Sequence, residues 1–142
     1  MLAAGAEDTA YTVSAADLLA GFSDVDIATN GQVLSVSGLT SSNGTVVDNA
    51  NGTFTVTPSA NFNGPVTLSY DVIDGNGGSV AATQSYSQAA VNDAPTGTAT
   101  AVLAAGVEDT AYTVSAADLL AGFSDVDGDT LSVSGLLSLI HI

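Results

Sequence analysis

Aspartate side chains recur at every second position in two short stretches of the sequence, which are Asp24 and Asp26 in the first and Asp125, Asp127 and Asp129 in the second. In the second group, Val126 and Gly128 stand between the aspartates. Alternating carboxylates in a glycine-bearing loop can direct several oxygens at one cation, and Ca²⁺ takes about six to eight oxygen ligands in proteins. Mg²⁺ is the weaker candidate because it keeps several of its waters. The pattern therefore indicates a calcium site.

Two alternatives to a shared ion remain open for these aspartates. They could form Asx turns in solvated loops, and the local pattern gives this alternative about the same weight as metal binding. An EF-hand loop is not supported, because glycine stands at its fourth position and Leu136 at the twelfth, where that loop requires glutamate. Paired carboxylates could also hydrolyse glycosides, but nothing in the sequence indicates a sugar cleft beside them.

The overall charge limits the classes of partner. The 142 residues include 15 acidic side chains and no lysine or arginine, so the formal net charge is −15. Nucleic acids and anionic lipid surfaces are excluded as electrostatic partners, because no basic side chain can neutralise their phosphates. No apolar stretch approaches the roughly 20 residues needed to insert into a membrane. A hydrophobic content of 46% nevertheless allows a packed core.

An internal repeat decides the expected organisation. Residues 7–26 recur unchanged at 108–127, and the hexapeptide at 34–39 recurs at 131–136. Between these matches the first copy has seven residues (27–33) and the second has three (128–130), so we expect a loop there. We expect residues 1–93 to form one complete repeat and 94–98 a linker. Residues 99–136 would then be a truncated second repeat, too short to bury both faces of a sandwich, followed by a non-repeat tail at 137–142.

Alternating apolar and polar residues predict short strands. The pattern is clearest at 66–72 and 53–57, and further strands are expected at 10–13, 33–39, 45–48 and 79–91. Asn-Gly and Asp-Gly pairs fall between them as turns. Ser14, with Asp17 three residues later, predicts the capped start of one short helix in each repeat. The predicted fold class is an all-β, antiparallel sandwich in tandem.

The combined motifs resemble the bacterial cadherin-like tandem repeats of large RTX-type surface adhesins. They are Glu-Asp-Thr, Asp-x-Asp-Gly-Asp, Asp-Gly-Asn-Gly-Gly and Val-Asn-Asp-Ala-Pro, and the resemblance covers residues 2–136. It implies an Ig/cadherin-like Greek-key sandwich of seven strands, joined end to end with neighbouring repeats of the same chain and binding Ca²⁺ at the junctions. It also implies an extracellular or cell-surface location, as part of a larger exported protein that serves as a spacer in adhesion and biofilm formation.

The resemblance also implies which residues share the ions. Glu7, Asn92 and Asp93 would meet Asp125 and Asp127, with Asp129 as a further ligand. Asp24, Asp26, Asn30 and Asp74 would belong to the junction with an upstream repeat, and Glu108 to a downstream one. Relative to the second copy, the first has Ile27-Ala28 in place of Gly128-Asp129, so its loop has one carboxylate fewer.

Enzymatic activity and ligand binding are the two alternatives to a spacer. Enzymatic activity has little support, because the sole histidine, His141, is the one base that could activate a serine and it lies in the non-repeat tail. A carbohydrate- or surface-ligand-binding module is the alternative to a spacer. Surface glycans would be held by exposed aromatic side chains. Phe62, in the loop at 61–64, is the candidate aromatic for such a contact, and its mutation would test this alternative.

Overall fold

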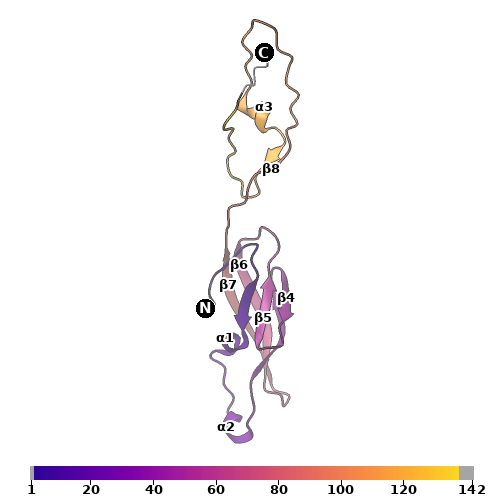
Figure 1. The fold of residues 1–142 in the computed structure, drawn as a ribbon. Coiled ribbons are helices and arrows are strands. Elements are labelled where there is room, and N and C mark those ends of the chain that lie inside the picture. Colours follow the sequence, from indigo (N-terminus) through magenta and orange to yellow (C-terminus); the bar gives the residue numbers. More distant parts are fainter. Residues whose placement is uncertain (1, 138–142) are drawn as a thin grey trace. The chain divides into compact units, whose positions relative to one another are not determined.

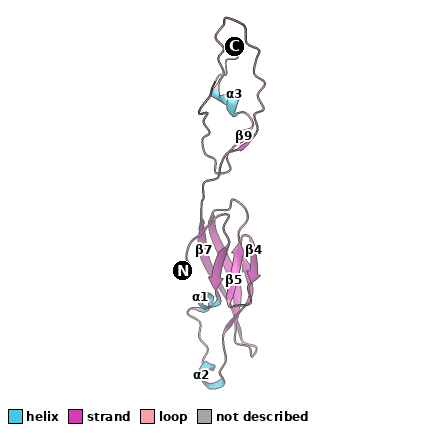
Figure 2. Ribbon diagram, in the orientation of Figure 1, coloured by secondary structure: helices cyan, strands magenta, loops and turns pink. Residues whose placement is uncertain are grey.

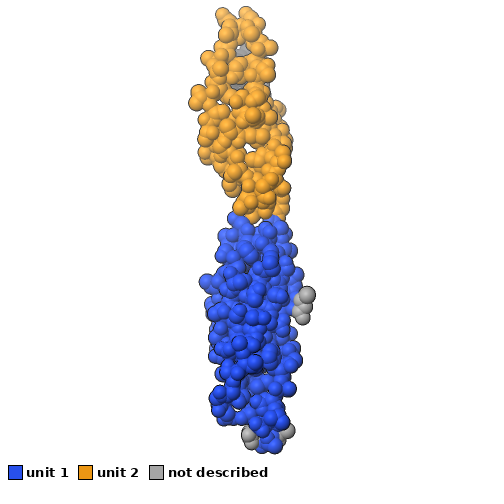
Figure 3. All heavy atoms as spheres, turned by 180° about the vertical axis from the view of Figure 1, so that it is seen from behind, with its two compact units in different colours: residues 1–91 blue, residues 92–142 orange. Residues whose placement is uncertain are grey.

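The structure is a computed structural model, and it describes residues 2–137 apart from the side chains of Ala28 and Asn30. His141 and all but the first residue of the predicted tail lie outside the described residues. The chain divides into two compact units, Met1–Val91 and Asn92–Ile142 (Figure 3). Asn92 and Asp93, which we expected in the first repeat, belong to the second unit.

Unit 1 is an all-β sandwich, as predicted (Figure 2). Its seven strands are β1 (Gly5–Ala6), β2 (Tyr11–Ser14), β3 (Ser35–Ser41), β4 (Thr45–Asp48), β5 (Thr53–Thr57), β6 (Gly64–Ile73) and β7 (Ser79–Ala89). One sheet has the order β1-β7-β6-β3 and the other the order β2-β5-β4. Figure 1 labels β6 and β7 of the first sheet and β4 and β5 of the second. The chain changes sheet after β1, after β2, after β3 and again between β5 and β6. All pairings in the two sheets are antiparallel except the two-residue parallel pairing of β1 with β7.

The core of unit 1 follows the predicted alternation. In β6 the inward positions are Val66, Leu68, Tyr70 and Val72, all buried, and the residues between them are exposed. Phe54 and Val56 of β5 face them from the second sheet and belong to the same buried cluster. Fully burying a side chain of this size contributes about 1.5–3 kcal/mol. Strands β5 and β6 therefore supply six of the nine buried side chains of this core within the described residues.

Two short helices connect strands in unit 1. Helix α1 (Ala15–Leu19) is the predicted one, and the Asp17 amide donates to Ser14 Oγ at 3.1 Å, which is the expected cap. Leu18 of α1 is fully buried. Helix α2 (Ile27–Asn30) was not expected, because the insert at 27–33 has no helical periodicity. It is a single turn that ends at Gly31, whose φ of 64° is left-handed.

Unit 2 contains much less regular structure. It has β8 (Thr96–Gly97) paired with β9 (Phe123–Ser124), and the helix α3 (Ala116–Leu120), which is the counterpart of α1. The predicted linker at 94–98 thus contains β8. Among the described residues of this unit no hydrophobic side chain is fully buried. Residues 99–142 include no counterpart of the segment 45–91, which forms β4 to β7 in unit 1.

Candidate metal centre

Glu7 is the most buried acidic residue in unit 1, with 1% of its surface exposed. Its carboxylate accepts hydrogen bonds from the amide of Val91 at 2.6 Å and from Asn63 Nδ2 at 3.3 Å. Its own amide donates to the carbonyl of Ala89 at 2.9 Å. Glu7 therefore fixes the backbone directly after β7, at the end of unit 1 where the chain leaves it.

The opposite end of unit 1 carries the other predicted ligands of the first copy. Asp24 and Asp74 line one cavity of about 190 Å³, and Asp24 Oδ1 accepts from the amide of Asp26 at 2.7 Å. Asp26 stands directly before α2, and Asn30 is the last residue of that helix. Because β7 runs from the turn after Asp74 to Ala89, the acids divide between the two ends of the sandwich.

Asp74 is held by its own turn. Its Oδ1 accepts hydrogen bonds from the amides of Asn76 at 2.8 Å and Gly78 at 2.9 Å. Hydrogen bonds from the backbone amides, that of Asn76 above all, lower the pKa of Asp74 from its ordinary value. The carboxylate is therefore kept ionised, and its negative charge stays at this end of unit 1.

The predicted ligands of the second copy lie close together in unit 2. Asp125 Oδ1 accepts from the amides of Asp127 at 2.9 Å and Asp129 at 3.4 Å, and Asp127 Oδ2 accepts from the amide of Asp93 at 2.7 Å. The loop of alternating aspartates is thus hydrogen-bonded to Asp93 of the Asn-Asp pair. Asn92 Nδ2 donates to the carbonyl of Asp93 at 2.9 Å.

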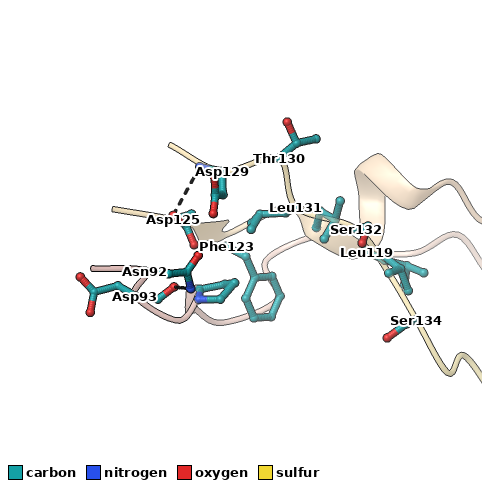
Figure 4. A pocket seen from close by; sticks show the side chains of 13 residues that line it. Asn92, Asp93, Leu119, Phe123, Asp125, Asp129, Thr130, Leu131, Ser132 and Ser134 are labelled. Atoms are coloured by element: carbon teal, nitrogen blue, oxygen red, sulfur yellow. Dashed lines mark hydrogen bonds between the residues drawn. The ribbon is translucent and has the colours of Figure 1, made fainter. Parts of the chain in front are cut away.

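Four of these residues, Asp127 being the exception, line a cavity of about 560 Å³ within unit 2 (Figure 4). Asn92, Asp93, Asp125 and Asp129 lie at one end of the view, and Leu131 and Leu119 lie farther along the cavity. The donor set is made of carboxylate and amide oxygens without sulfur, and such hard oxygens are the ligands that Ca²⁺ takes. In chemical type, the residues present fit that ion.

The acids are adjacent without converging on one point. Over the part of the chain that the structure describes, no three acidic, histidine or cysteine side chains are grouped closely enough to hold a metal ion. Glu7 belongs to unit 1, whereas the rest of its predicted ligand set belongs to unit 2. Glu108 is exposed in unit 2, where its carbonyl accepts from Thr110 Oγ1 at 3.3 Å. Shared coordination of an ion by these residues stays a prediction.

Sequence reasoning missed Asn63, which donates to the Glu7 carboxylate. It also missed that Asp8, the neighbour of Glu7 in the sequence, accepts through Oδ1 from the amide of Asn61 at 2.9 Å. Asp8 and Asn61 both have positive φ, of 56° and 55°. The available signal was the turn sequence at 61–64, in which two asparagines precede a glycine. It predicted a loop, but not that the loop packs against the start of the chain.

The chain was compared with known protein families. A family described as the cadherin-like domain matches residues 1–88 and 91–141. The chain belongs to the cadherin-like domain family. The gap between the two matched segments, residues 89–90, lies just before the boundary between units 1 and 2. No curated protein and no solved structure matches the chain significantly.

Cadherin-like domains are generally extracellular modules for structure and adhesion without enzymatic activity, and they typically bind calcium. The seven-stranded sandwich of unit 1 agrees with this family. In the described part of this cadherin-like chain, no helix is both long enough and apolar enough to cross a bilayer.

Proposed function

We propose that this chain is a calcium-stabilised spacer from the stalk of an extracellular bacterial adhesin of the RTX type. Its partners would be calcium ions and neighbouring repeats of the same exported chain. The observation that carries the proposal is the placement of acids at both ends of unit 1. Glu7 stands where the chain leaves the sandwich, and Asp24 and Asp74 stand at the opposite end.

This placement suits a repeat that meets a neighbour at each end. A module that bound one ion for its own use would need its ligands at one place. Here the same acids recur in the second copy, where Asp125 and Asp127 correspond to Asp24 and Asp26. The hydrogen bond from the amide of Asp93 to Asp127 Oδ2 supports a role for the Asn-Asp pair beside that loop.

The proposed mechanism is electrostatic. With a net charge of −15, the chain has no lysine or arginine that could neutralise its acids. Calcium bound at a junction removes their mutual repulsion and fixes the angle between neighbouring repeats, which stiffens the stalk. Extracellular modules bind calcium with dissociation constants of about 10⁻⁴–10⁻³ M, which suits a calcium-rich medium.

The glycan-binding alternative depends on exposed aromatics. Phe62, the residue singled out for it, packs against the core cluster, and Tyr11 stacks on Tyr86 with ring centroids 4.0 Å apart. These three rings contribute to packing inside unit 1. The spacer is therefore the function that we propose.

The test uses two complete repeats, made by replacing residues 137–142 with a copy of residues 40–93. Thermal melts and small-angle scattering are recorded in 10 mM Ca²⁺, in 10 mM Mg²⁺ and in chelator. With the affinities above, Ca²⁺ adds about 1.4–2.7 kcal/mol to the free energy of unfolding, because it binds only the native state. The scattering profile should also become that of a stiffer particle.

Matched variants assign the effect to the proposed ligands. Combined Asp93→Asn, Asp125→Asn and Asp127→Asn should abolish the response to Ca²⁺. Asp48→Asn with Asp71→Asn removes charge from strands β4 and β6 and should preserve it. If neither the melt nor the scattering changes with Ca²⁺, the junction mechanism is wrong.

A further inference from the structure

Five of the eight asparagines of this chain stand directly before a glycine, and all five are in unit 1. They are Asn30, Asn43, Asn51, Asn63 and Asn76. Asparagine is a thermolabile residue, and it reacts fastest before glycine, because a glycine amide reaches the side-chain carbonyl carbon without hindrance from a Cβ. The product is a five-membered succinimide ring. The side chain of Asn30 lies outside the described residues, so four of these sites can be compared.

Hydrogen bonds hold two of the four side chains in their turns. Asn43 Oδ1 accepts from the amide of Ser59 at 3.0 Å. Asn51 Oδ1 accepts from the amide of Thr53 at 3.1 Å and from its Oγ1 at 2.6 Å. These bonds must break before the carbonyl carbon can turn toward the next amide in the chain. The fold therefore slows the reaction at both positions.

The glycines after these two asparagines are held as well. A Cβ at Gly44 would overlap the carbonyl oxygen of Thr57, so the backbone of β5 lies directly against this glycine. The carbonyl of Gly52 accepts from the amide of Ala15 at 2.8 Å. Ring closure needs the backbone to move at the asparagine and at the glycine after it. Packing and hydrogen bonding oppose that movement here.

Asn63 is fixed through its side chain and through the strand that follows it. Its Nδ2 donates to the carboxylate of Glu7 at 3.3 Å. Gly64, which carries the attacking amide, is the first residue of β6 and pairs with Gln88 of β7. Attack would therefore cost both the side-chain bond and the end of a strand pairing.

Asn76 and Gly77 lack these constraints. Both are exposed, and they lie in the turn between Ile73, where β6 ends, and Ser79, where β7 begins. Among the described residues, the side chain of Asn76 has no hydrogen-bond partner, although its backbone amide donates to Asp74. A Cβ at Gly77 would meet no atom within 4 Å, so the space around this glycine is open.

The same turn protects its aspartate. Asp74 also precedes a glycine, but hydrogen bonds from backbone amides, that of Asn76 above all, lower the pKa of Asp74 and keep it ionised. An ionised carboxylate is a poor target for a nucleophile, so the neighbouring ring closure at Asp74 is suppressed. The amide of Gly77 is another of these donors. A proton acceptor therefore stands beside the nitrogen that would attack Asn76.

We propose that Asn76 is the site at which folded unit 1 deamidates fastest, without an enzyme. The amide nitrogen of Gly77 attacks Cγ of Asn76, and the new N–Cγ bond replaces the bond from Cγ to Nδ2. Ammonia leaves with the proton that the Gly77 amide has lost. One water molecule then opens the ring, either at the new N–Cγ bond to give aspartate or at the backbone C–N bond to give isoaspartate. The net change is hydrolysis of one amide.

The aspartate product repeats a spacing found elsewhere in the chain. It places a second carboxylate two residues after Asp74, which is the spacing of Asp24 and Asp26. Asp24 and Asp74 line the same cavity, so the added charge falls at the end of unit 1 that already holds these acids. An effect of this charge on calcium rests on the proposed function, whereas the deamidation itself does not.

Peptide mapping of the full chain tests the proposal. The protein is aged in a mildly alkaline buffer with chelator, and pepsin digests it in acid, because the chain has no lysine or arginine for trypsin. Tandem mass spectrometry then gives the fraction of acid at each asparagine. We expect acid to form at Asn76 about tenfold faster than at Asn43, Asn51 or Asn63, whose hydrogen bonds must first break.

Two controls separate the fold from the local sequence. In urea the four rates should become similar, because every site is then followed by a glycine in an unfolded chain. The Asn76→Gln chain keeps an exposed amide but closes a larger ring slowly, so it should release much less ammonia than the native protein. The Asn76→Asp chain serves as the mass and charge standard for the product.

Two results would overturn the proposal. One is a rate at Asn76 that is equal to or below the rate at any of the other three sites in the folded chain. The other is a difference between the sites that persists unchanged in urea, because the sequence and not the fold would then set the rates. Since chelator is present throughout, neither result depends on the proposed calcium role.

Discussion

Residues 7–26 and residues 108–127 have the same sequence, but the first stretch lies in a sandwich and the second in a unit without one. Leu18 is fully buried, whereas its counterpart Leu119 is only half-buried. Glu7 is buried and hydrogen-bonded to the end of β7, whereas Glu108 is exposed. The same sequence thus occurs once with partner strands, in unit 1, and once without them, in unit 2.

Local features are the same in both copies. The amides of Asp17 and Asp118 donate to Ser14 Oγ and Ser115 Oγ at 3.1 and 3.0 Å, and each bond caps a five-residue helix. Contacts within three or four residues therefore follow from the sequence of the stretch itself. Strand β2 behaves differently, because residues 112–115 have the same sequence as Tyr11–Ser14 and form no strand. A strand needs a neighbour to pair with, and β5 has no counterpart in unit 2.

Completing the second copy should have the largest effect. Replacing residues 137–142 with a copy of residues 40–93 supplies the missing strands, so a second sandwich should form with a free energy of unfolding of about 5–15 kcal/mol. Hydrogen exchange read by mass spectrometry should show protection of residues 112–115, which form no strand in the present chain. The same chain with Pro at the position copied from Val56 is the control, because proline removes a pairing amide from the new sandwich.

Truncating a core side chain of β6 should have the next largest effect. Leu68 is fully buried and has no counterpart in unit 2, so Leu68→Ala should lower the free energy of unfolding by about 2–5 kcal/mol. Leu119→Ala, in the copy without partner strands, should change it by less than about 0.5 kcal/mol. Urea denaturation followed by circular dichroism measures both. Similar losses in the two variants would show that unit 2 has a core of its own.

Removing one hydroxyl tests what anchors α1 and not α3. Tyr70 Oη donates to the carbonyl of Leu18, so Tyr70→Phe leaves a buried acceptor without this donor and should cost about 1–3 kcal/mol. Tyr112→Phe is the matched control, because Tyr112 is 48% exposed. Thermal denaturation compares the two variants. Equal melting temperatures would mean that the hydroxyl of Tyr70 does not hold the helix.

The smallest expected effect concerns pH and the turn after Asp74, which only unit 1 has. Hydrogen bonds from the amides of Asn76 and Gly78 lower the pKa of Asp74 below its ordinary 3.8. Because the pKa of Asp74 is lower in the folded turn than in the unfolded chain, ionised Asp74 stabilises the folded turn at pH values above the unfolded pKa. This contribution is lost as the pH falls through the folded pKa. The amide resonances of Asn76 and Gly78 should therefore titrate with a midpoint below 3.8 in an NMR pH series. Asp74→Asn should remove the titration, and a midpoint at or above 3.8 would contradict the assignment.

The fold of unit 1 could be predicted largely from sequence, because its signals are periodic. Alternation predicted β6 and β5, Asn-Gly pairs predicted turns, and Ser14 predicted the start of α1. Strand β1 was missed because two residues, Gly5 and Ala6, carry no alternation, and its partner β7 is far away in the sequence. Helix α2 was missed for a related reason, since one turn has no apolar face.

The candidate site was predictable in part. The repeat positions of Glu7 and of the aspartate loops drew attention to residues that the structure places at the two ends of unit 1 and together in unit 2. The partners of Glu7 could not be found in this way. Asn63 and the amide of Val91 contact it only after the sandwich has formed, and no spacing in the sequence encodes those contacts.

The parallel pairing of β1 with β7 has a mechanical consequence. Gly5 pairs with Gln88 and Ala6 with Ala89. A tension applied to the chain before β1 and after β7 therefore pulls these two strands in opposite directions along their common axis. The load then falls on their hydrogen bonds together, and not on one bond at a time. The bonds that Glu7 makes to Ala89 and Val91 continue the same row and share the load. The sandwich therefore resists stretching at the point where tension first reaches it.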